Sequence, residues 1–451
     1  MTAIHLRRAL LPQGWRDEVR LVFADGLIAS VESDAQATPG DEVAAVGVPG
    51  MANLHSHAFQ RAMAGLTEQR GGKTDTFWTW RETMYRFALS IGPDEMEAVA
   101  ALLYAEMLEA GFTSVGEFHY LHHAPDGQPY ANIAELAERI VAAAQTTGLG
   151  LTLLPVFYAH GNFGGAAPHE GQRRFLNDPA RFARLLEASR AAVARLPGAS
   201  VGVAPHSLRA VTEAELTAVI AMAEGGPIHM HIAEQVREVD DSLAWAGARP
   251  VQWLLARFAV DRHWCLIHAT HMTDFETTGL ARTGAVAGLC PITEGNLGDG
   301  IFPARPFRAA GGRYGIGSDS NVRIGVAAEL RQLEYAQRLL HRERNVLAEA
   351  GGSTGRALLE AAAAGGAQAL GAPMHGLRVG APADLVTLAA DGPLYAHLAD
   401  DQLLDAWVFS AGNALVDGVW ARGVKRVSGG RHHDRAALSE RYRAAMATLM
   451  G

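Results

Sequence analysis

Several short apolar runs of this 451-residue chain end in histidines or acidic residues. This pattern is suited to metal chemistry. His55 and His57 end the first run, and two positions apart on a strand both imidazoles project to the same face. Later runs end in or beside further ionisable side chains, namely His206, His231, Glu234, His268 and Asp319. Imidazole nitrogens with one carboxylate suit Zn²⁺ and are also accepted by Fe²⁺. The pattern therefore predicts a divalent-metal site, with zinc as the first choice and iron as the alternative.

Eight apolar runs alternate with longer helical patterns and predict the elements that position these side chains. The runs cover residues 47–57, 112–120, 149–158, 199–207, 227–234, 263–270, 284–291 and 312–320. Nearly all-apolar strands separated by helices indicate a parallel sheet with helices on its faces. Eight such pairs close a (β/α)8 barrel, whose active sites gather at the C-terminal strand ends. We therefore expect an α/β protein with a TIM-like barrel and the ionisable side chains at one rim.

The two ends of the chain carry short strand patterns joined by Asp-Gly turn signals. Residues 1–47 and 378–430 are each too short for a comfortable core of their own. We predict that they pair into one small composite β-sandwich domain, with the barrel, residues 48–377, inserted between them. Residues 431–451 have the spacing of a terminal amphipathic helix.

Composition excludes several classes of protein. The net charge of −9 argues against nucleic acid as a partner. No run of about 18 apolar residues occurs and the N-terminus lacks the apolar core of a signal peptide, so no membrane partner is expected. Two cysteines, Cys265 and Cys290, cannot form a disulfide framework and are expected to be small buried side chains. These features predict a soluble cytoplasmic protein.

Four motifs at the predicted strand ends, NLHSHAFQR, HIAEQ, IHATH and GSDSN, resemble those of the amidohydrolase superfamily. The resemblance extends over nearly the whole chain, including the split β domain. It implies that one metal ion is held by four side chains, His55, His57, His231 and Asp319. Members with two metals use a carboxylated lysine, or a glutamate, at the end of strand four as a bridge. Here the only lysines, Lys73 and Lys425, lie outside the predicted barrel strands, so a mononuclear site is expected.

The resemblance also implies catalytic roles for His268, Glu234 and Asp319. A metal lowers the pKa of a bound water towards about 7 and so supplies hydroxide at neutral pH. His268 stands where the superfamily places a base or electrostatic partner for this water, and as a base its ring must be neutral. Glu234 is expected to protonate the substrate nitrogen, and Asp319 to pass a proton on to the leaving group.

The run GMANLHSHAFQRAMAGLTE is similar to the family of formimidoylglutamate deiminases. This similarity implies substrate contacts for five side chains, Gln60, Arg81, Tyr120, His206 and Arg209. Arg81 is expected in a long loop after the first strand. Arginine recognises carboxylates by paired N–H groups, so two arginines suit a dicarboxylate substrate. The implied reaction is the metal-dependent hydrolysis of N-formimino-L-glutamate to N-formyl-L-glutamate and ammonia in histidine degradation, by a homodimer.

Two other functions stay open on the sequence alone. One is deamination of a neutral heterocycle, such as guanine or a related purine, for which no arginine would be needed. Zinc deaminases of the cytidine type are excluded, because their PCxxC motif is absent. The other is a catalytically silent barrel used for binding or assembly, although such a protein usually lacks a ligand, and all four ligands are present here.

Overall fold

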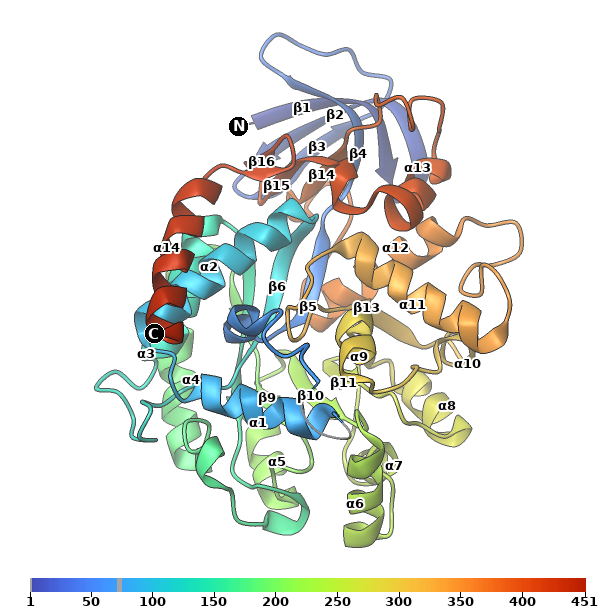
Figure 1. The fold of residues 1–451 in the computed structure, drawn as a ribbon. Helices are drawn as coiled ribbons and strands as arrows, with labels where there is room; N and C mark the ends of the chain where they lie inside the picture. Colours follow the sequence, from blue (N-terminus) through green and yellow to red (C-terminus); the bar gives the residue numbers. More distant parts are fainter. Residues whose placement is uncertain (1, 71–74) are drawn as a thin grey trace.

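Eight parallel strands form a closed barrel in the computed structural model, which describes residues 2–70 and 75–451 (Figure 1). The strands are β5 (Met51–Ser56), β6 (Phe112–His119), β7 (Gly150–Phe157), β8 (Ser200–Val201) with β9 (Ala204–Pro205), β10 (Ile228–Ile232), β11 (Trp264–His268), β12 (Val286–Leu289) and β13 (Arg313–Ile316). Ladders join β5 to β8 and β10 to β13, and bridges between Ser56 and Asp319 and between Ser207 and His231 close the ring. The predicted TIM-like α/β barrel is confirmed. Lys73 lies outside the described residues.

Helices cover the outside of the barrel and alternate with its strands (Figure 1). They are α2 (Pro93–Glu109), α3 (Glu135–Thr147), α4 (Pro179–Val193), α5 (Glu213–Ala221), α6 (Val236–Ala246), α7 (Pro250–Arg257), α8 (Asp274–Thr283), α9 (Pro291–Leu297), α10 (Ala304–Ala309), α11 (Val326–His341) and α12 (Thr354–Ala369). Local sequence explains their starts: Pro93 stands in the first turn of α2, and the side chains of Thr212 and Thr273 cap α5 and α8. Among the residues that the structure describes, no helix is long and apolar enough to cross a membrane.

The terminal segments pair into one eight-stranded sheet at the N-terminal end of the barrel (Figure 1). Its order is β17 (Arg431–His432), β16 (Val424–Ser428), β15 (Val416–Ala421), β14 (Leu385–Leu388), β4 (Glu42–Pro49), β1 (Thr2–Leu11), β2 (Gly14–Ala24) and β3 (Leu27–Glu32). In its centre β4 runs parallel to β1 and antiparallel to β14, so both ends of the chain are needed. Leu6, Leu21 and Trp420 belong to the separate apolar core of this sheet. The predicted pairing of the two ends into one β domain is thus present, while its form as a sandwich and its bounds at 47 and 430 stay predictions.

Short elements complete the chain. They are η1 (Ala58–Met63), η2 (Phe163–Gly165), η3 (Glu170–Gln172), α13 (Asp401–Ala406), η4 (Trp407–Ala411), η5 (Gly412–Leu415) and the C-terminal α14 (Arg435–Met450). α14 packs along α2, where Arg435 forms ion pairs with Glu106 and Glu109 at 3.2 and 2.9 Å (Figure 1). The terminal helix therefore fastens the end of the chain to the barrel.

Helix α1 (Phe77–Ala88) borders the C-terminal rim of the barrel and carries Arg81, so the expectation of a loop for Arg81 is wrong. The helix begins where the Thr79 hydroxyl accepts the Thr76 N–H at 3.1 Å. Its other end is held by Arg174, which is fully buried and donates to the carbonyl oxygens of Ala88, of Ile91 at 2.7 Å and of His123 at 2.7 Å. One buried guanidinium thus ties the C-terminal end of α1 to the neighbouring loops at Ile91 and His123.

We expect Arg174→Met to lower the free energy of unfolding by about 3 kcal/mol or more, because three buried carbonyl oxygens lose a charged donor. Urea denaturation followed by circular dichroism measures this loss. Arg441→Met is the control: Arg441 pairs with Glu97 near the surface, and such a pair contributes less than about 1 kcal/mol. An equal loss of stability in both variants would show that Arg174 does not anchor α1.

Candidate active site

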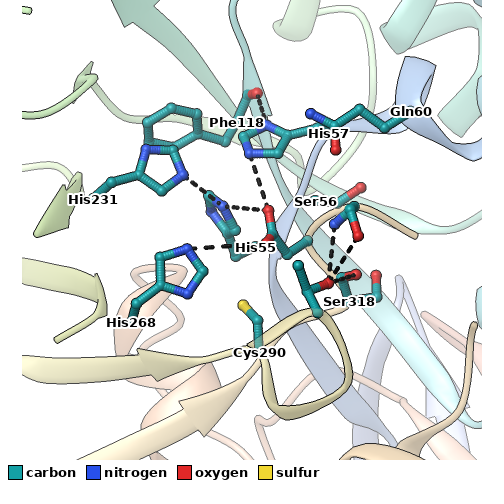
Figure 2. A network of polar contacts seen from close by, with 12 residues as sticks. His55, Ser56, His57, Gln60, Phe118, His231, His268, Cys290 and Ser318 are labelled. Carbon is teal, nitrogen blue, oxygen red and sulfur yellow. Dashed lines mark hydrogen bonds and ion pairs between the residues drawn. The ribbon is translucent and has the colours of Figure 1, made fainter. Parts of the chain in front are cut away.

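Three histidines and one aspartate converge at the C-terminal rim of the barrel. His55 lies on β5 and His57 directly follows it, His231 lies on β10 and Asp319 follows β13. The Nε2 atoms of His55 and His231 lie 3.0 Å apart, and Asp319 Oδ1 lies 3.3 Å from His55 Nε2 and 3.1 Å from His57 Nε2. Figure 2 shows the three rings turned toward one another. The structure therefore brings together the four side chains that the resemblance implies as metal ligands.

Backbone carbonyls turn two of these rings so that Nε2 faces the centre of the cluster. His57 Nδ1 lies 3.0 Å from the carbonyl oxygen of Phe118, and His231 Nδ1 lies 3.0 Å from that of His206. When Nδ1 donates its hydrogen, Nε2 keeps the lone pair that a metal ligand needs. Two nitrogens bound to one zinc ion at about 2.1 Å lie a little over 3 Å apart, close to the separation of His55 and His231. The four side chains fit one divalent ion.

Burial controls the charge of the cluster. It lowers the pKa of His55 to about 3 and that of His231 well below its ordinary value. Burial alone would raise the pKa of Asp319, but the neighbouring rings of His55 and His57 hold it well below its usual range. Burial therefore favours neutral rings at His55 and His231 and the neighbouring rings favour an ionised Asp319, the states in which these groups bind metals.

Left-handed backbone concentrates at the strand ends that carry this cluster. The φ angle is +50° at Ala233, +67° at His268 and +46° at Asp319, and none of these residues is glycine. Such backbone costs about 1 to 3 kcal/mol per residue and needs support from its surroundings. Glu238 accepts the N–H of Ala233 at 3.2 Å, and Asn321 donates to the carbonyl oxygen of His57 at 3.0 Å. Buried polar side chains thus hold the rim in a geometry that the backbone alone disfavours.

His268 lies beside the cluster (Figure 2), and three carboxylates surround its ring. Its Nε2 is 3.6 Å from Glu234 Oε1 and 3.9 Å from Asp319 Oδ2, and its Nδ1 is 3.3 Å from Glu294 Oε1. Burial would lower the pKa of His268, but these carboxylates raise it to about 10. The neutral ring expected of a base therefore requires a compensating charge, which a cation held by Asp319 would provide.

A cavity opens beside the cluster at the C-terminal rim of the barrel. All five predicted substrate contacts line it, namely Gln60, Arg81, Tyr120, His206 and Arg209. Gln60 Nε2 donates to the Tyr120 hydroxyl at 2.7 Å, while its buried Oε1 has no partner within the described part of the chain. Arg81 stacks on Trp78 with 4.4 Å between the guanidinium carbon and the ring centre.

Arg209 is the buried cation of this cavity, with 6% of its surface exposed. Its nearest carboxylates, Glu234 and Glu238, are both 3.9 Å away, which is longer than a hydrogen bond. Its Nε has no hydrogen-bond partner among residues 2–70 and 75–451. A buried guanidinium with an unused donor is suited to a carboxylate ligand.

Three residues of this region were not found from the sequence. Tyr158 directly follows β7 and lines the cavity, so the strand-end rule would have found it. Glu294 lies in the first turn of α9, shortly after β12, and its contact with His268 requires a helix start that the strand pattern does not show. Asp299 lies in the loop after α9, in a Gly-rich stretch that carries no local signal of burial.

Comparisons with known families cover both parts of the chain. The amidohydrolase family matches residues 46–426, and the family described as "Formimidoylglutamate deiminase HutF, N-terminal domain" matches residues 1–45. A formimidoylglutamate deiminase of Pseudomonas aeruginosa is 51% identical over 454 residues, which cover 100% of this chain and 99% of that protein.

Solved structures agree with this assignment. A crystal structure of an amidohydrolase from Brucella melitensis is 58% identical, with a TM-score of 0.98 and 100% coverage of both chains. An adenosine deaminase from Xanthomonas campestris, solved with bound zinc, shares the fold at 23% identity and a TM-score of 0.81, with 100% of this chain and 98% of that chain covered. The chain therefore belongs to the amidohydrolase family and, within it, to the family of formimidoylglutamate deiminases.

Proposed function

We infer that the protein hydrolyses N-formimino-L-glutamate to N-formyl-L-glutamate and ammonia, a deimination of histidine degradation. The observation that carries this inference is one cavity that joins the histidine–aspartate cluster to two arginines, Arg81 and Arg209. A formimino group placed at the cluster leaves the two carboxylates of glutamate to the arginines. A neutral heterocycle would instead leave the buried Arg209 without a hydrogen-bonded counter-charge. The 51% identity to a formimidoylglutamate deiminase supports the same substrate.

We propose that one divalent ion, zinc first and Fe²⁺ as the alternative, is held by His55, His57, His231 and Asp319. When bound, such an ion supplies hydroxide near neutral pH and polarises the amidine carbon. Three imidazoles and one carboxylate suit this ion in number and type. The zinc in the structure of the Xanthomonas campestris relative supports the choice of metal.

His268, Glu234 and Asp319 are proposed to move the protons. Over one turnover a C–O bond forms at the amidine carbon, the C–N bond breaks, and both protons of the water leave with the nitrogen as ammonia. His268 Nε2 stands 3.6 Å from Glu234 and 3.9 Å from Asp319, so small movements place the three groups in one proton path. Gln60, Tyr120 and His206 are proposed to orient the substrate from the cavity wall.

The direct test is release of ammonia by the zinc-loaded protein from N-formimino-L-glutamate, N-formiminoglycine, guanine and adenosine. We expect turnover of N-formimino-L-glutamate, a much lower kcat/KM for N-formiminoglycine, which lacks the side-chain carboxylate, and none for the heterocycles. Turnover of guanine or adenosine alone would replace this function by heterocycle deamination. No turnover of any substrate by metal-loaded protein would favour a silent barrel.

Arg209→Lys should lower kcat/KM for N-formimino-L-glutamate by about 100-fold, because lysine keeps the charge but cannot offer paired N–H groups to a carboxylate. Steady-state kinetics should show the loss mainly as a higher KM. Arg237→Lys is the matched control, because Arg237 stacks on Trp78 at the rim and its side chain is 62% exposed. Unchanged kinetics in Arg209→Lys would remove carboxylate recognition from this residue.

A homodimer, which the resemblance implies, and a cytoplasmic location, which the composition predicts, both stay predictions. Light scattering of the purified protein checks the first: the expected mass is twice that of the 48.0 kDa chain. A mass of one chain across the concentration range of the assay would show that the protein is a monomer.

A further inference from the structure

A second carboxyl group, Asp299, lies next to Glu234 and lacks a donor for one of its oxygens. Glu234, His268 and Asp299 each offer an atom, and these three atoms lie within 4.8 Å of one another. Gln235 Nε2 donates to Asp299 Oδ1, whereas the buried Asp299 Oδ2 has no hydrogen-bond partner in the part of the chain that is described. The residue is 5% exposed. Burying a carboxylate oxygen without a donor is costly, so a proton or a ligand is expected to satisfy it.

The backbone holds Asp299 in this place. The N–H of Asp299 donates to the carbonyl oxygen of Glu294 at 2.9 Å, and the carbonyl oxygen of Asp299 lies 2.8 Å from His271 Nε2. Gly300, directly after it, has a φ of +140°, which side chains with a Cβ rarely adopt. The loop therefore sets the carboxyl group beside Glu234 instead of letting it turn to solvent.

Acidic groups outnumber basic groups around this pair. The charged groups that face it are Glu238, Glu294 and Asp319 on the acidic side and Arg209 and His268 on the basic side. Burial raises the pKa of Glu234 and of Asp299, and the carboxylate of Glu234 raises the pKa of Asp299 further. Two buried carboxyl groups this close do not readily ionise together, so one proton stays with the pair.

We propose that Asp299 is a positioning residue that shares one proton with Glu234, directly or through one water molecule, and so presents Glu234 to the substrate as a carboxylic acid. This rests on the proposed deiminase function, in which Glu234 protonates the leaving nitrogen. Glu234 supplies one of the two protons that this nitrogen gains: its O–H bond breaks and an N–H bond forms as a C–O bond forms at the amidine carbon. The second proton comes from the added water by way of His268 and Asp319, and the C–N bond then breaks with its electron pair on ammonia. The water that adds to the amidine carbon returns the proton to the pair.

The near-isosteric Asp299→Asn variant tests this pair in the zinc-loaded protein. Infrared difference spectra across a pH series follow the C=O band of protonated carboxyl groups and need no substrate. We expect the wild type to lose such a band only above neutral pH, and Asp299→Asn to lose it at a pH lower by about one unit or more, because the like-charged neighbour is gone. In the pH profile of kcat/KM for N-formimino-L-glutamate, the basic limb should move to lower pH by the same amount. The value of kcat/KM on the plateau at lower pH should change little.

Glu329→Gln is the matched control, because Glu329 is fully buried, has an unpartnered Oε1 and does not line the cavity. The basic limb of the kcat/KM pH profile of Glu329→Gln should stay at the same pH as in the wild type. A loss of kcat/KM in Asp299→Asn that is equal at every pH would reduce Asp299 to a structural residue. Fewer metal ions per chain in Asp299→Asn than in the wild type would identify a cation site instead of a shared proton. An infrared shift without any turnover would uphold the pair and refute the deiminase function.

Discussion

His231→Asn should bind its metal far more weakly and lower kcat/KM for N-formimino-L-glutamate by about 1,000-fold or more, which is several kcal/mol of transition-state stabilisation. The reason is geometric: His231 Nε2 lies 3.0 Å from His55 Nε2, and its ring is fixed by the carbonyl oxygen of His206. Removing it opens the cluster on the side of β10. Atomic emission spectroscopy after dialysis measures metal per chain, and steady-state kinetics measure turnover.

His229→Asn is the matched control for this variant. His229 lies two positions earlier on the same strand, is fully buried, and bonds to the carbonyl oxygen of Ala369 at 2.8 Å. The same change of side chain should therefore disturb the core without removing a metal ligand, and metal content should stay at the wild-type level. Full metal content and turnover in His231→Asn would rule out the proposed ligand set.

His268→Asn should keep the metal and still lose kcat by about 100-fold to 10,000-fold, the range in which general acid–base catalysis contributes. His268 is not among the four side chains that converge on one ion, but its Nε2 faces both Glu234 and Asp319. Asparagine retains a polar group of similar reach and cannot take up a proton. Single-turnover kinetics at saturating substrate measure the loss with metal content monitored in the same samples.

Added imidazole separates a proton-transfer role of His268 from a structural one. If the ring moves a proton, imidazole should restore part of the turnover of His268→Asn, with a pH dependence that follows the neutral form of imidazole. Wild-type turnover in His268→Asn, or a loss that tracks loss of metal, would remove this residue from proton transfer.

The position of the histidine–aspartate cluster was predictable because it depends on two regular features. Alternation along a strand puts His55 and His57 on one face, and the closure of a parallel barrel brings the C-terminal strand ends to one rim. Both features follow from regular geometry, so the prediction of the cluster holds even when the predicted bounds of an element are wrong by two or three residues. His231 and Asp319 are distant in sequence, yet the rule that joins them to the first strand is topological.

Other parts of the site depend on contacts that no local pattern encodes. Arg81 lies in α1 and not in a loop, and the Thr76–Thr79 cap is the local signal for the start of this helix. Asp299 is different, because its burial arises from Gln235, His271 and Glu294, which belong to three separate segments. The charge of His268 likewise follows from carboxylates gathered by tertiary structure.

The central place of β4 in the terminal sheet has a consequence for synthesis on the ribosome. β4 ends at Pro49 and its partner β14 begins at Leu385, 385 − 49 = 336 positions later. At about 5 to 20 residues per second, that partner is translated about 17 to 67 s after β4. During this interval the edge of β4 that does not pair with β1 is open to pairing with other nascent chains. Shielding of the first 50 residues by a chaperone should therefore raise the yield of native protein most when translation is slow.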